Sequence, residues 1–416
     1  MKLKDIAIYV SDKISSDSID LDSYVTTDSL LQNKAGREQA TNLPPQSCTL
    51  THFKANDILV ANIRPYLKKV WLADRDGGCN ADVLVFRVKP DHSSNFLYAI
   101  LLQDAFYGYA MKGAKGSKMP RGDKEQIMRY EIPTLTSTEE SIGEFIVNIN
   151  AKIAINREIN RNLEAMARQL YDYWFVQFDF PDENGRPYKS SGGKMVWNEK
   201  LKRAIPEGWT DCTLQRYIGR ITNGLNPRQH FVLGTGSNYY VSIRSLEGRD
   251  INWESCEKCD DVALSKINSR SQLQCGDIIF SAIGTIGRTY YIQENPYNWN
   301  ISETSFTIRS SDDIPSSFFY ELLISPEIQM QADKNAMGST MRCLVMDALC
   351  KIPTTNIPTY VVNRFNAIIT PIHKKIYESN KEKRNLYKLR DELLPLLMNG
   401  QVSVMPQEVN CDLSHD

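Results

Sequence analysis

The fold is decided by residues 142–174, which read IGEFIVNINAKIAINREINRNLEAMARQLYDYW. Apolar and amide side chains recur in this stretch at alternating steps of three and four residues, which is the a/d spacing of a coiled-coil seam. The seam positions are Ile146, Ile149, Ile153, Asn156, Asn160, Leu163, Ala167, Leu170 and Trp174. Such a helix must bury its seam against a partner. The two asparagines would fix the register, because a mispaired buried amide leaves its hydrogen-bonding groups unsatisfied.

A second stretch with the same spacing lies at the far end of the chain, from about Tyr360 to Gly400, an expected helix stop. Its seam positions are Phe365, Ile369, Ile372, Ile376, Ser379, Lys383, Leu386, Arg390, Leu393 and Leu397. Both helices are nearly three times the mean length of about 12 residues, which favours a coiled coil over ordinary amphipathic helices on a globular core. We expect the two helices to pair, forming a rod of roughly 45 to 50 Å that can act as a spacer.

The composition is that of an ordinary soluble protein of two or three domains, with 416 residues, 42% hydrophobic and 24% charged. The net charge of -1 gives the molecule no strong field, so any nucleic-acid surface must be a local basic patch. We find no apolar run of about 18 residues and no signal core behind the N-terminus. We therefore expect a cytoplasmic protein without a membrane segment.

The sequence repeats itself. Four anchors recur in the same order at nearly constant offsets: Asp57-Ile58-Leu59 with Asp277-Ile278-Ile279 (277 − 57 = 220), Gly116-Ser117-Lys118-Met119 with Gly338-Ser339-Thr340-Met341 (338 − 116 = 222), Ile132-Pro133 with Ile352-Pro353 (352 − 132 = 220), and Asn162-Leu163 with Asn385-Leu386 (385 − 162 = 223). The chain therefore consists of two copies of one unit, each a globular domain followed by a long helix.

Strand-like runs, turn residues and helical patterns alternate in both globular parts, which predicts an α/β (α+β) fold class. We predict six segments along the chain: a first globular domain at 1–138, a central long helix at 139–177, a linker at 178–204, a second globular domain at 205–358, a C-terminal long helix at 359–399 and a tail at 400–416. Two similar domains on two long helices suggest a pseudo-twofold protein that reads a pseudo-symmetric partner, such as DNA with two half-sites.

Motifs of catalysis are missing from the sequence. It contains no phosphate-binding loop, no dinucleotide-binding glycine motif, no His-Glu-x-x-His zinc motif and no Gly-x-Ser-x-Gly nucleophile elbow. The single Cys256-x-x-Cys259 pair lacks a second ligand pair and is weak as a zinc motif. We expect no catalytic residues and no metal site in this chain.

Taken together, these features resemble the specificity (S) subunit of type I restriction-modification systems. The resemblance covers essentially the whole chain. Besides the repeat, it rests on the aromatic exit from the first helix, the opening of the second domain and the paired loops: Tyr171-Asp172-Tyr173-Trp174-Phe175, Ile205-Pro206-Glu207-Gly208-Trp209, Gly116-Ser117 and Gly338-Ser339. One departure is that the first domain begins without the Pro-x-Gly-Trp lead-in seen at Pro206.

The resemblance implies a non-catalytic, DNA-binding subunit. The globular parts would be target-recognition domains, each reading one half of a split sequence in double-stranded DNA, and the helices would pair as an antiparallel coiled coil between them. It further implies docking of two methyltransferase (M) subunits, which carry S-adenosylmethionine, and of restriction (R) subunits. Methylation and cleavage, with ATP and Mg²⁺, would belong to these partners, so no cofactor is expected in this chain.

The two repeated loops are the first candidates for DNA contact. Their charge and backbone N–H groups suit phosphate binding. The candidates are Lys112, Lys115, Gly116, Ser117, Lys118 and Arg121 in the first domain, and Gly338, Ser339, Thr340 and Arg342 in the second. We predict Arg342, with Ser339 and Thr340, as the equivalent of the first loop. The alternative is that both are solvated surface loops.

Further candidates follow the matched Asp57 and Asp277 strands. They are Arg64, Tyr66, Lys68 and Lys69 in the first domain, and Thr285, Arg288 and Tyr290 in the second. Arginine pairs bidentately with guanine, which makes such positions suited to reading bases. The alternative is that basic residues at strand ends are simply solvated.

Two other functions remain open from the sequence. The first is a coiled-coil scaffold that joins protein partners without touching DNA. The second is a self-contained methylating or cleaving enzyme, which the missing motifs argue against.

Overall fold

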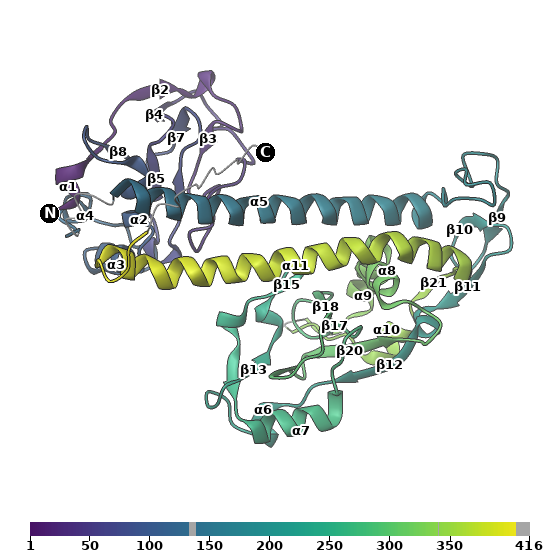
Figure 1. Cartoon of the computed structure of the whole chain (residues 1–416). Coiled ribbons are helices and arrows are strands. Elements are labelled where there is room, and N and C mark those ends of the chain that lie inside the picture. The colour runs from purple at the N-terminus through teal and green to yellow at the C-terminus, as the bar shows by residue number, and fades with distance from the viewer. Residues whose placement is uncertain (133–138, 340, 405–416) are drawn as a thin grey trace, which may run out of the picture. The chain divides into compact units, whose positions relative to one another are not determined.

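The computed structural model describes residues 1–132, 139–339 and 341–404 (Figure 1). Its contacts divide the chain into two compact units: unit 1 combines Met1–Glu158 with the chain from Lys381 onward, and unit 2 is Ile159–Asn380. Both boundaries fall inside the long helices α5 (Glu139–Tyr171) and α11 (Thr359–Met398), so each unit contains a segment of each helix. Mixed helices and sheets with two long helices confirm the predicted fold class. Residues 133–138 of the predicted first domain and 405–416 of the predicted tail lie outside the described residues.

Unit 1 holds two four-stranded sheets, in the orders β1-β8-β5-β6 and β2-β4-β7-β3. Its strands are β1 (Ala7–Tyr9), β2 (Lys13–Ser15), β3 (Tyr24–Val25), β4 (Thr49–Phe53), β5 (Ile58–Ala61), β6 (Val70–Leu72), β7 (Gly77–Cys79) and β8 (Val83–Val88). Its short helices are α1 (Leu3–Ile6), α2 (Ser94–Leu101), α3 (Asp104–Lys112) and α4 (Lys124–Ile127). Every residue of β5 is buried, as its continuous apolar sequence predicts for a central strand.

Unit 2 is built around the sheet β12-β20-β17-β18, with a second sheet β16-β13-β19 and the strand pairs β10-β9, β11-β21 and β14-β15. Its strands are β9 (Met195–Asn198), β10 (Arg203–Pro206), β11 (Thr210–Thr213), β12 (Ile218–Asn223), β13 (Asn238–Val241), β14 (Leu246–Glu247), β15 (Asp250–Ile251), β16 (Glu257–Cys259), β17 (Ile278–Ser281), β18 (Thr289–Tyr291), β19 (Trp299–Ile301), β20 (Ser305–Ser310) and β21 (Pro353–Asn356). Its short helices are α6 (Pro227–His230), α7 (Asp261–Ser271), α8 (Ser316–Ile324), α9 (Pro326–Asn335) and α10 (Met346–Cys350).

The internal repeat is present in the sheets of the two units. The order β1-β8-β5-β6 in unit 1 matches the order β12-β20-β17-β18 in unit 2. Immediately before each central strand a buried aspartate accepts two hydrogen bonds from an arginine on the neighbouring strand: Asp57 from Arg87 at 2.8 and 2.7 Å, and Asp277 from Arg309 at 2.7 and 2.9 Å. Such bidentate pairing satisfies a carboxylate that would otherwise be unstable inside the protein.

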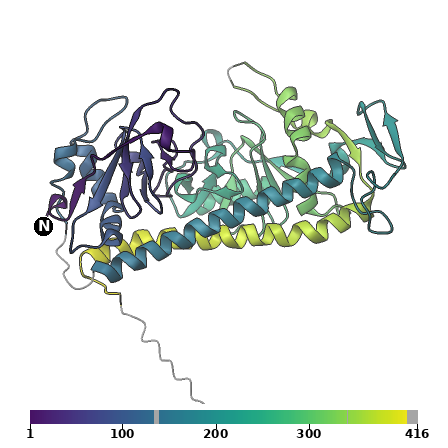
Figure 2. The ribbon, with the colours of Figure 1, turned by 90° about the horizontal axis from the view of Figure 1, so that it is seen from above.

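Within unit 1, the segments of α5 and α11 run antiparallel and lie side by side (Figure 2). Asn156 donates to Glu382 at 2.8 Å, and Arg390 donates to Asn150 at 2.8 Å. A later residue of α5 therefore meets an earlier residue of α11, which defines the direction of pairing. The cost of burying Asn156 is offset by this bond.

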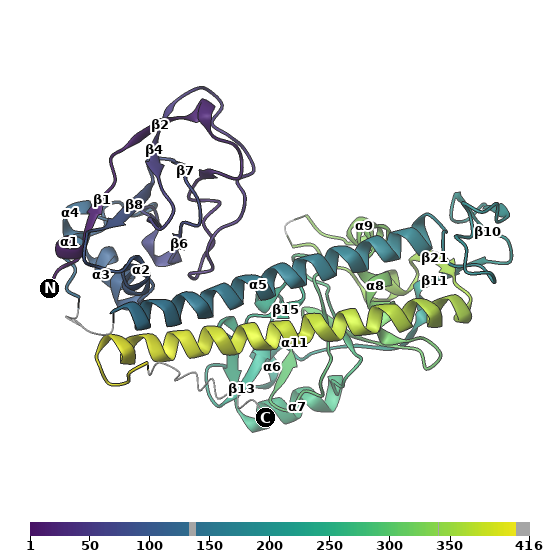
Figure 3. The same ribbon diagram turned by 45° about the horizontal axis from the view of Figure 1, so that its top comes forward.

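Unit 2 contains the other segments of the two helices, which also pair in opposite directions (Figure 3). Asn160 donates to Asn380 at 2.7 Å, and the Phe365 ring lies 6.2 Å from the Tyr171 ring. Across both units, the predicted seam residues Ile146, Ile149, Ile153, Asn156, Asn160, Ile372 and Ile376 are buried, and Leu163, Leu170, Leu386 and Leu393 are half-buried.

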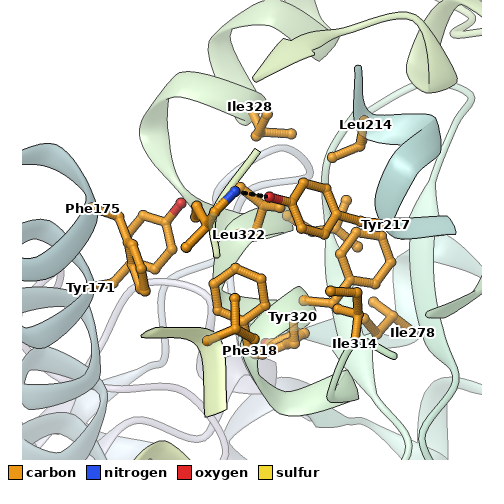
Figure 4. Packing of buried hydrophobic residues seen from close by; sticks show 14 of the residues in the cluster. Tyr171, Phe175, Leu214, Tyr217, Ile278, Ile314, Phe318, Tyr320, Leu322 and Ile328 are labelled. Carbon is orange, nitrogen blue, oxygen red and sulfur yellow. Dashed lines mark hydrogen bonds between the residues drawn. The ribbon is translucent and has the colours of Figure 1, made fainter. Parts of the chain in front are cut away.

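The main apolar core of unit 2 forms where the helices meet the sheet. Tyr171 and Phe175 lie beside Phe318 of α8 (Figure 4), with the Phe175 and Phe318 rings 5.4 Å apart. Phe365 of α11 is fully buried and packs against Phe175 at 5.0 Å and Trp174 at 5.6 Å. Because aromatic side chains bury large areas, we expect this cluster to contribute much of the stability of unit 2.

A buried polar group also joins α11 to this unit. The carboxylate of Glu321 in α8 lies 2.6 Å from Nε2 of His373 in α11 and 2.9 Å from a nitrogen of Arg249. Burial opposes ionisation of Glu321, yet the hydrogen bond from His373 and the charge of Arg249 hold the pKa of the carboxyl below its usual value. Burial lowers the pKa of the His373 imidazole, which therefore stays neutral and donates to the carboxylate.

Truncating Phe365 should destabilise the protein, because a large buried ring would leave a cavity in the aromatic cluster. We expect F365A to lower the free energy of unfolding by about 3 to 5 kcal/mol. Denaturant unfolding of the full chain measures this. The control is I368A on the same helix, where the side chain is 44% exposed and a change within about 0.5 kcal/mol is expected. Equal stabilities of the two variants would contradict this description of the core.

Stability should fall on acidification through His373 and Glu321. Below pH 6.5 the unfolded histidine takes up a proton that the folded imidazole does not, and below pH 4.5 the same holds for the glutamate. The unfolded state then binds more protons, so the free energy of unfolding decreases as pH falls. Unfolding curves between pH 7 and pH 5 should show a smaller decrease in H373Q than in the unaltered protein, whereas H230Q, at an exposed histidine, should retain it. Parallel pH profiles for all three proteins would disprove this role.

Candidate nucleic-acid interface

The first predicted loop is closed by a pair of backbone hydrogen bonds. Lys115 and Arg121 each donate their N–H to the other's carbonyl at 2.9 Å, and the loop between them is exposed at Gly116, Ser117 and Lys118. Gly116 has a φ of +98°, a conformation that favours glycine. We call this arrangement, in which two residues joined by two backbone hydrogen bonds close an exposed loop, the clamped loop.

The clamped loop of unit 1 is fixed beside the chain that leaves β5. Arg64 donates its N–H to the Pro120 carbonyl at 2.8 Å, and Gly122 donates to the Asn62 carbonyl at 3.1 Å. The structure thus brings the candidate loop 112–121 against Arg64, the first residue of the candidate segment 64–69, which is far from the loop in the sequence.

The charged side chains of this surface differ in their pairing. Arg121 lies 3.0 Å from Asp82, and Lys115 lies 3.6 Å from Asp123. In the described part of the chain, exposed Lys112 and Lys118 have no ion-pair partner. These two lysines are therefore available for a phosphate without breaking an existing pair.

Of the residues that follow β5, only some face solvent. Tyr66 is exposed, and Arg64 is half-buried at a φ of +51°. Lys68 forms an ion pair with Asp104 at 2.9 Å. Lys69 is buried, which lowers the pKa of its amine, and it donates to the Thr27 carbonyl. Lys69 therefore serves the fold and does not reach the exposed surface.

Unit 2 contains the same clamped loop. Met337 and Cys343 exchange backbone hydrogen bonds of 2.9 and 2.8 Å around Gly338, whose φ is +100°. The loop is fixed beside the chain that leaves β17, because Gly284 donates to the Arg342 carbonyl at 2.8 Å and Leu344 donates to the Ala282 carbonyl at 2.8 Å.

This match shows which residues of the two loops correspond. At the offset of 222, Cys343 occupies the place of Arg121, and Arg342 occupies that of Pro120. Arg342 also forms an ion pair with Asp333 and donates to its carbonyl. Ser339 is exposed, whereas Thr340 lies outside the described residues.

The remaining candidates of the second domain lie in different environments. Thr285 and Arg288 are exposed, and Arg288 donates to the Ile243 and Leu246 carbonyls at 3.1 and 3.2 Å. Tyr290 is buried on β18, with its ring 6.3 Å from that of Trp299. Tyr290 is therefore a core residue, because it belongs to the buried apolar cluster that contains Trp299.

Sequence reasoning missed one shared feature of the clamped loops. Met119 and Met341, at matched positions, are 50% and 69% exposed. The repeat Gly-Ser-x-Met carried this signal, since an apolar residue recurs in two otherwise polar loops. An exposed apolar side chain at the tip of a basic loop suits contact with a base or its methyl group.

Metal and membrane features are missing from the described residues. Within 1–132, 139–339 and 341–404, no group of three histidine, cysteine or acidic side chains could hold a metal ion. The Cys256 thiol is buried, which raises its pKa, and its sulfur contacts the Asn252 carbonyl at 3.4 Å. No helix within these residues has the length and apolar character needed to span a bilayer.

The structure thus has two units of mixed helix and sheet, each with a clamped loop and segments of two long antiparallel helices, and this fold is similar to that of a solved type I restriction-modification S subunit. The chain can be superposed on the crystal structure of the S subunit from M. genitalium with a TM-score of 0.58 at 15% identity, covering 96% of this chain and 95% of that one. This likeness shows the fold.

Sequence comparisons confirm the predicted resemblance. The chain is 22% identical over 371 residues to the type I restriction enzyme MjaIX specificity subunit of Methanocaldococcus jannaschii, covering 89% of this chain and 83% of the relative. It is also 22% identical over 438 residues to the HindI specificity subunit of Haemophilus influenzae, covering 91% and 94%. No family model matches the chain.

Adding a side chain at the loop glycines should open the clamped loops. A Cβ at Gly338 would lie 2.5 Å from the Met341 carbonyl oxygen, compared with 3.3 Å between a Cβ at Gly116 and that of Met119. Each substitution also incurs about 1 to 2 kcal/mol for its positive φ. We expect G338A to speed amide hydrogen exchange at Cys343, and G116A to have a smaller effect at Arg121.

The control for this experiment is G234A. Gly234 has a φ of +95°, and a Cβ there would meet nothing within 4 Å. The G234A variant has the same free-energy cost of a positive φ but no close contact of the added Cβ, so amide exchange at Cys343 should remain unchanged. Unaltered exchange in G338A would show that the glycine is not required by the loop.

Proposed function

We propose that this chain is the DNA sequence-recognition subunit of a type I restriction-modification complex, in which each unit reads one half of a split target. The observation that carries the proposal is the clamped loop, which occurs in both units with the same hydrogen bonds and the same glycine conformation. Two copies of one surface suit two half-sites. The similarity to named specificity subunits over nearly the whole chain supports the same function.

The clamped loops supply the direct contacts in this proposal. Lys112 and Lys118 bind backbone phosphates in the first half-site, and Arg121 joins them if DNA displaces Asp82. Tyr66, Met119 and Met341 lie at exposed positions suited to base edges. Sequence preference then follows from the loop side chains, while the backbone clamp sets their position.

The helices serve as spacer and docking surface in the same proposal. Apolar side chains remain exposed along α5 and α11, namely Ile155, Met166, Ile368, Leu389 and Leu396. We propose that two methyltransferase subunits cover these positions and that restriction subunits join the assembly. S-adenosylmethionine, ATP and Mg²⁺ would then act in those partners, and the complex would work in the cytoplasm.

The proposal is tested by sequencing host DNA with a method that reports methylated adenines, with the coding region intact and then deleted. We expect a split motif with a fixed gap to lose methylation on deletion. When the R121A or R342A variant is re-introduced, methylation should return only in part, because each variant removes a cation of a clamped loop. The control R129A, at an exposed arginine just after α4, should restore methylation fully. Unchanged methylation on deletion would favour a protein scaffold that does not contact DNA.

A further inference from the structure

Unit 2 contains a cleft of about 940 Å³ between α5 and the loops that follow β13 and β17. Five of its lining residues are arginines that come from three parts of the unit: Arg161, Arg168, Arg244, Arg249 and Arg288. The volume lies within the range of about 300 to 1,000 Å³ that is typical of ligand sites.

The arginines of the cleft differ in their partners. Arg249 is paired with buried Glu321 at 2.9 Å, and one nitrogen of Arg288 donates to two backbone carbonyls. Arg168 and Arg244 are exposed, and neither has an ion-pair partner among the described residues. Two guanidinium groups of the cleft are thus available to an anion.

Comparison of the two repeated parts shows that the positive charges of Arg168 and Arg244 are specific to unit 2. Tyr24 pairs with Gly78 as Tyr240 pairs with Asn300, an offset of 240 − 24 = 216, which matches Arg244 with Asp28 of unit 1. The helix offset of 391 − 168 = 223 matches Arg168 with Asp391. At both positions an acid in unit 1 is replaced by an arginine in unit 2.

In unit 1 two lysine side chains lie at the corresponding place. Lys34 is buried and lies 2.8 Å from Asp104 and 2.9 Å from Asp391. Lys68 also pairs with Asp104, at 2.9 Å. Asp391 also pairs with buried Arg390 at 3.0 Å, so two aspartates here face three cations.

Unit 2 has glycines where unit 1 has these lysines. The turn after β14 carries Gly248 at a φ of +58°, and the longer turn at the same place in unit 1 carries Asn33 at +55° and Lys34 at +62°. Gly287, at +86°, matches Lys68, at +51°, through the offset of 287 − 68 = 219. The side chains that lie at this place in unit 1 are thus missing, and the cleft remains open between arginines.

We propose that this cleft binds a phosphate group of the DNA backbone, an inference that rests on the proposed function and extends it. The planar guanidinium group matches two phosphate oxygens at once. One turn links the cleft to the clamped loop: Gly284 on it donates to the Arg342 carbonyl, and Arg288 at its end lines the cleft. Glu164 and Glu247 also line the cleft, so an anion bound there must lie against the guanidinium groups and away from these two carboxylates.

The inference is tested with two variants of the full chain, purified in the complex that it forms in its host. R168Q/R244Q removes the two unpaired guanidinium groups. R168D/G248K rebuilds the lysine–aspartate pair seen in unit 1, where a lysine adopts a similar positive φ. R186Q, at an exposed arginine of the same unit, is the control. Fluorescence anisotropy with a labelled duplex that contains the methylated motif, and with one that lacks it, gives Kd between about 0.05 and 0.2 M salt.

Both double variants should weaken binding of both duplexes by about tenfold at low salt. The slope of log K against log salt should become shallower by about 0.9, the contribution of one phosphate contact. The preferred motif should not change, because a backbone phosphate carries no sequence information. R186Q should match the unaltered complex.

Four results would overturn the inference, and they are distinguishable. If the unaltered complex binds duplex and the variants bind it equally, only the phosphate cleft is disproved. If the unaltered complex binds no duplex, the proposed function fails as well. Unchanged DNA binding with loss of partner subunits assigns the cleft to a protein. Calorimetric binding of ADP that R168Q/R244Q lacks, with an unchanged salt slope, assigns it to a free nucleotide.

Discussion

Each globular part depends on helix segments that are distant in sequence to complete its apolar core. In unit 1, Leu394, Leu397 and Met398 of α11 belong to the same buried cluster as Phe96 of α2. In unit 2, Trp174 and Phe365 meet in the core from opposite ends of the unit's sequence. Because burial of apolar surface is the dominant stabilising term, the sheets and the loops they carry are held in place by this arrangement.

The clamped loops of the two units are more alike in their backbone hydrogen bonds than in their side chains. The clamped loop is closed by main-chain groups, so Lys115 and Arg121 in one unit are replaced by Met337 and Cys343 in the other without loss of the bonds. A surface built in this way keeps its position while its side chains vary. Loops on a rigid scaffold commonly carry specificity for this reason.

The long helices could be predicted because they depend on the local spacing of apolar residues such as Ile146, Ile149 and Ile153, which are buried. The repeat could be predicted because its anchors recur in the sequence itself. The position of the two loops also followed from the Gly-Ser-x-Met anchors. By contrast, the burial of Lys69 and Tyr290 depends on Thr27 and Trp299, which are distant in sequence and become neighbours only in the folded units. Likewise, the arginine cleft emerges only when equivalent positions of the two units are compared.

The division of the chain also bears on its biosynthesis. Unit 1 begins with Met1 but is completed by α11, which ends at Met398. At translation rates of about 5 to 20 residues per second, the 398 − 158 = 240 residues that follow its first part take roughly 10 to 50 seconds to emerge. During that interval the nascent first domain exposes the apolar surface that α11 later covers. Chaperones at the ribosome can bind this exposed surface.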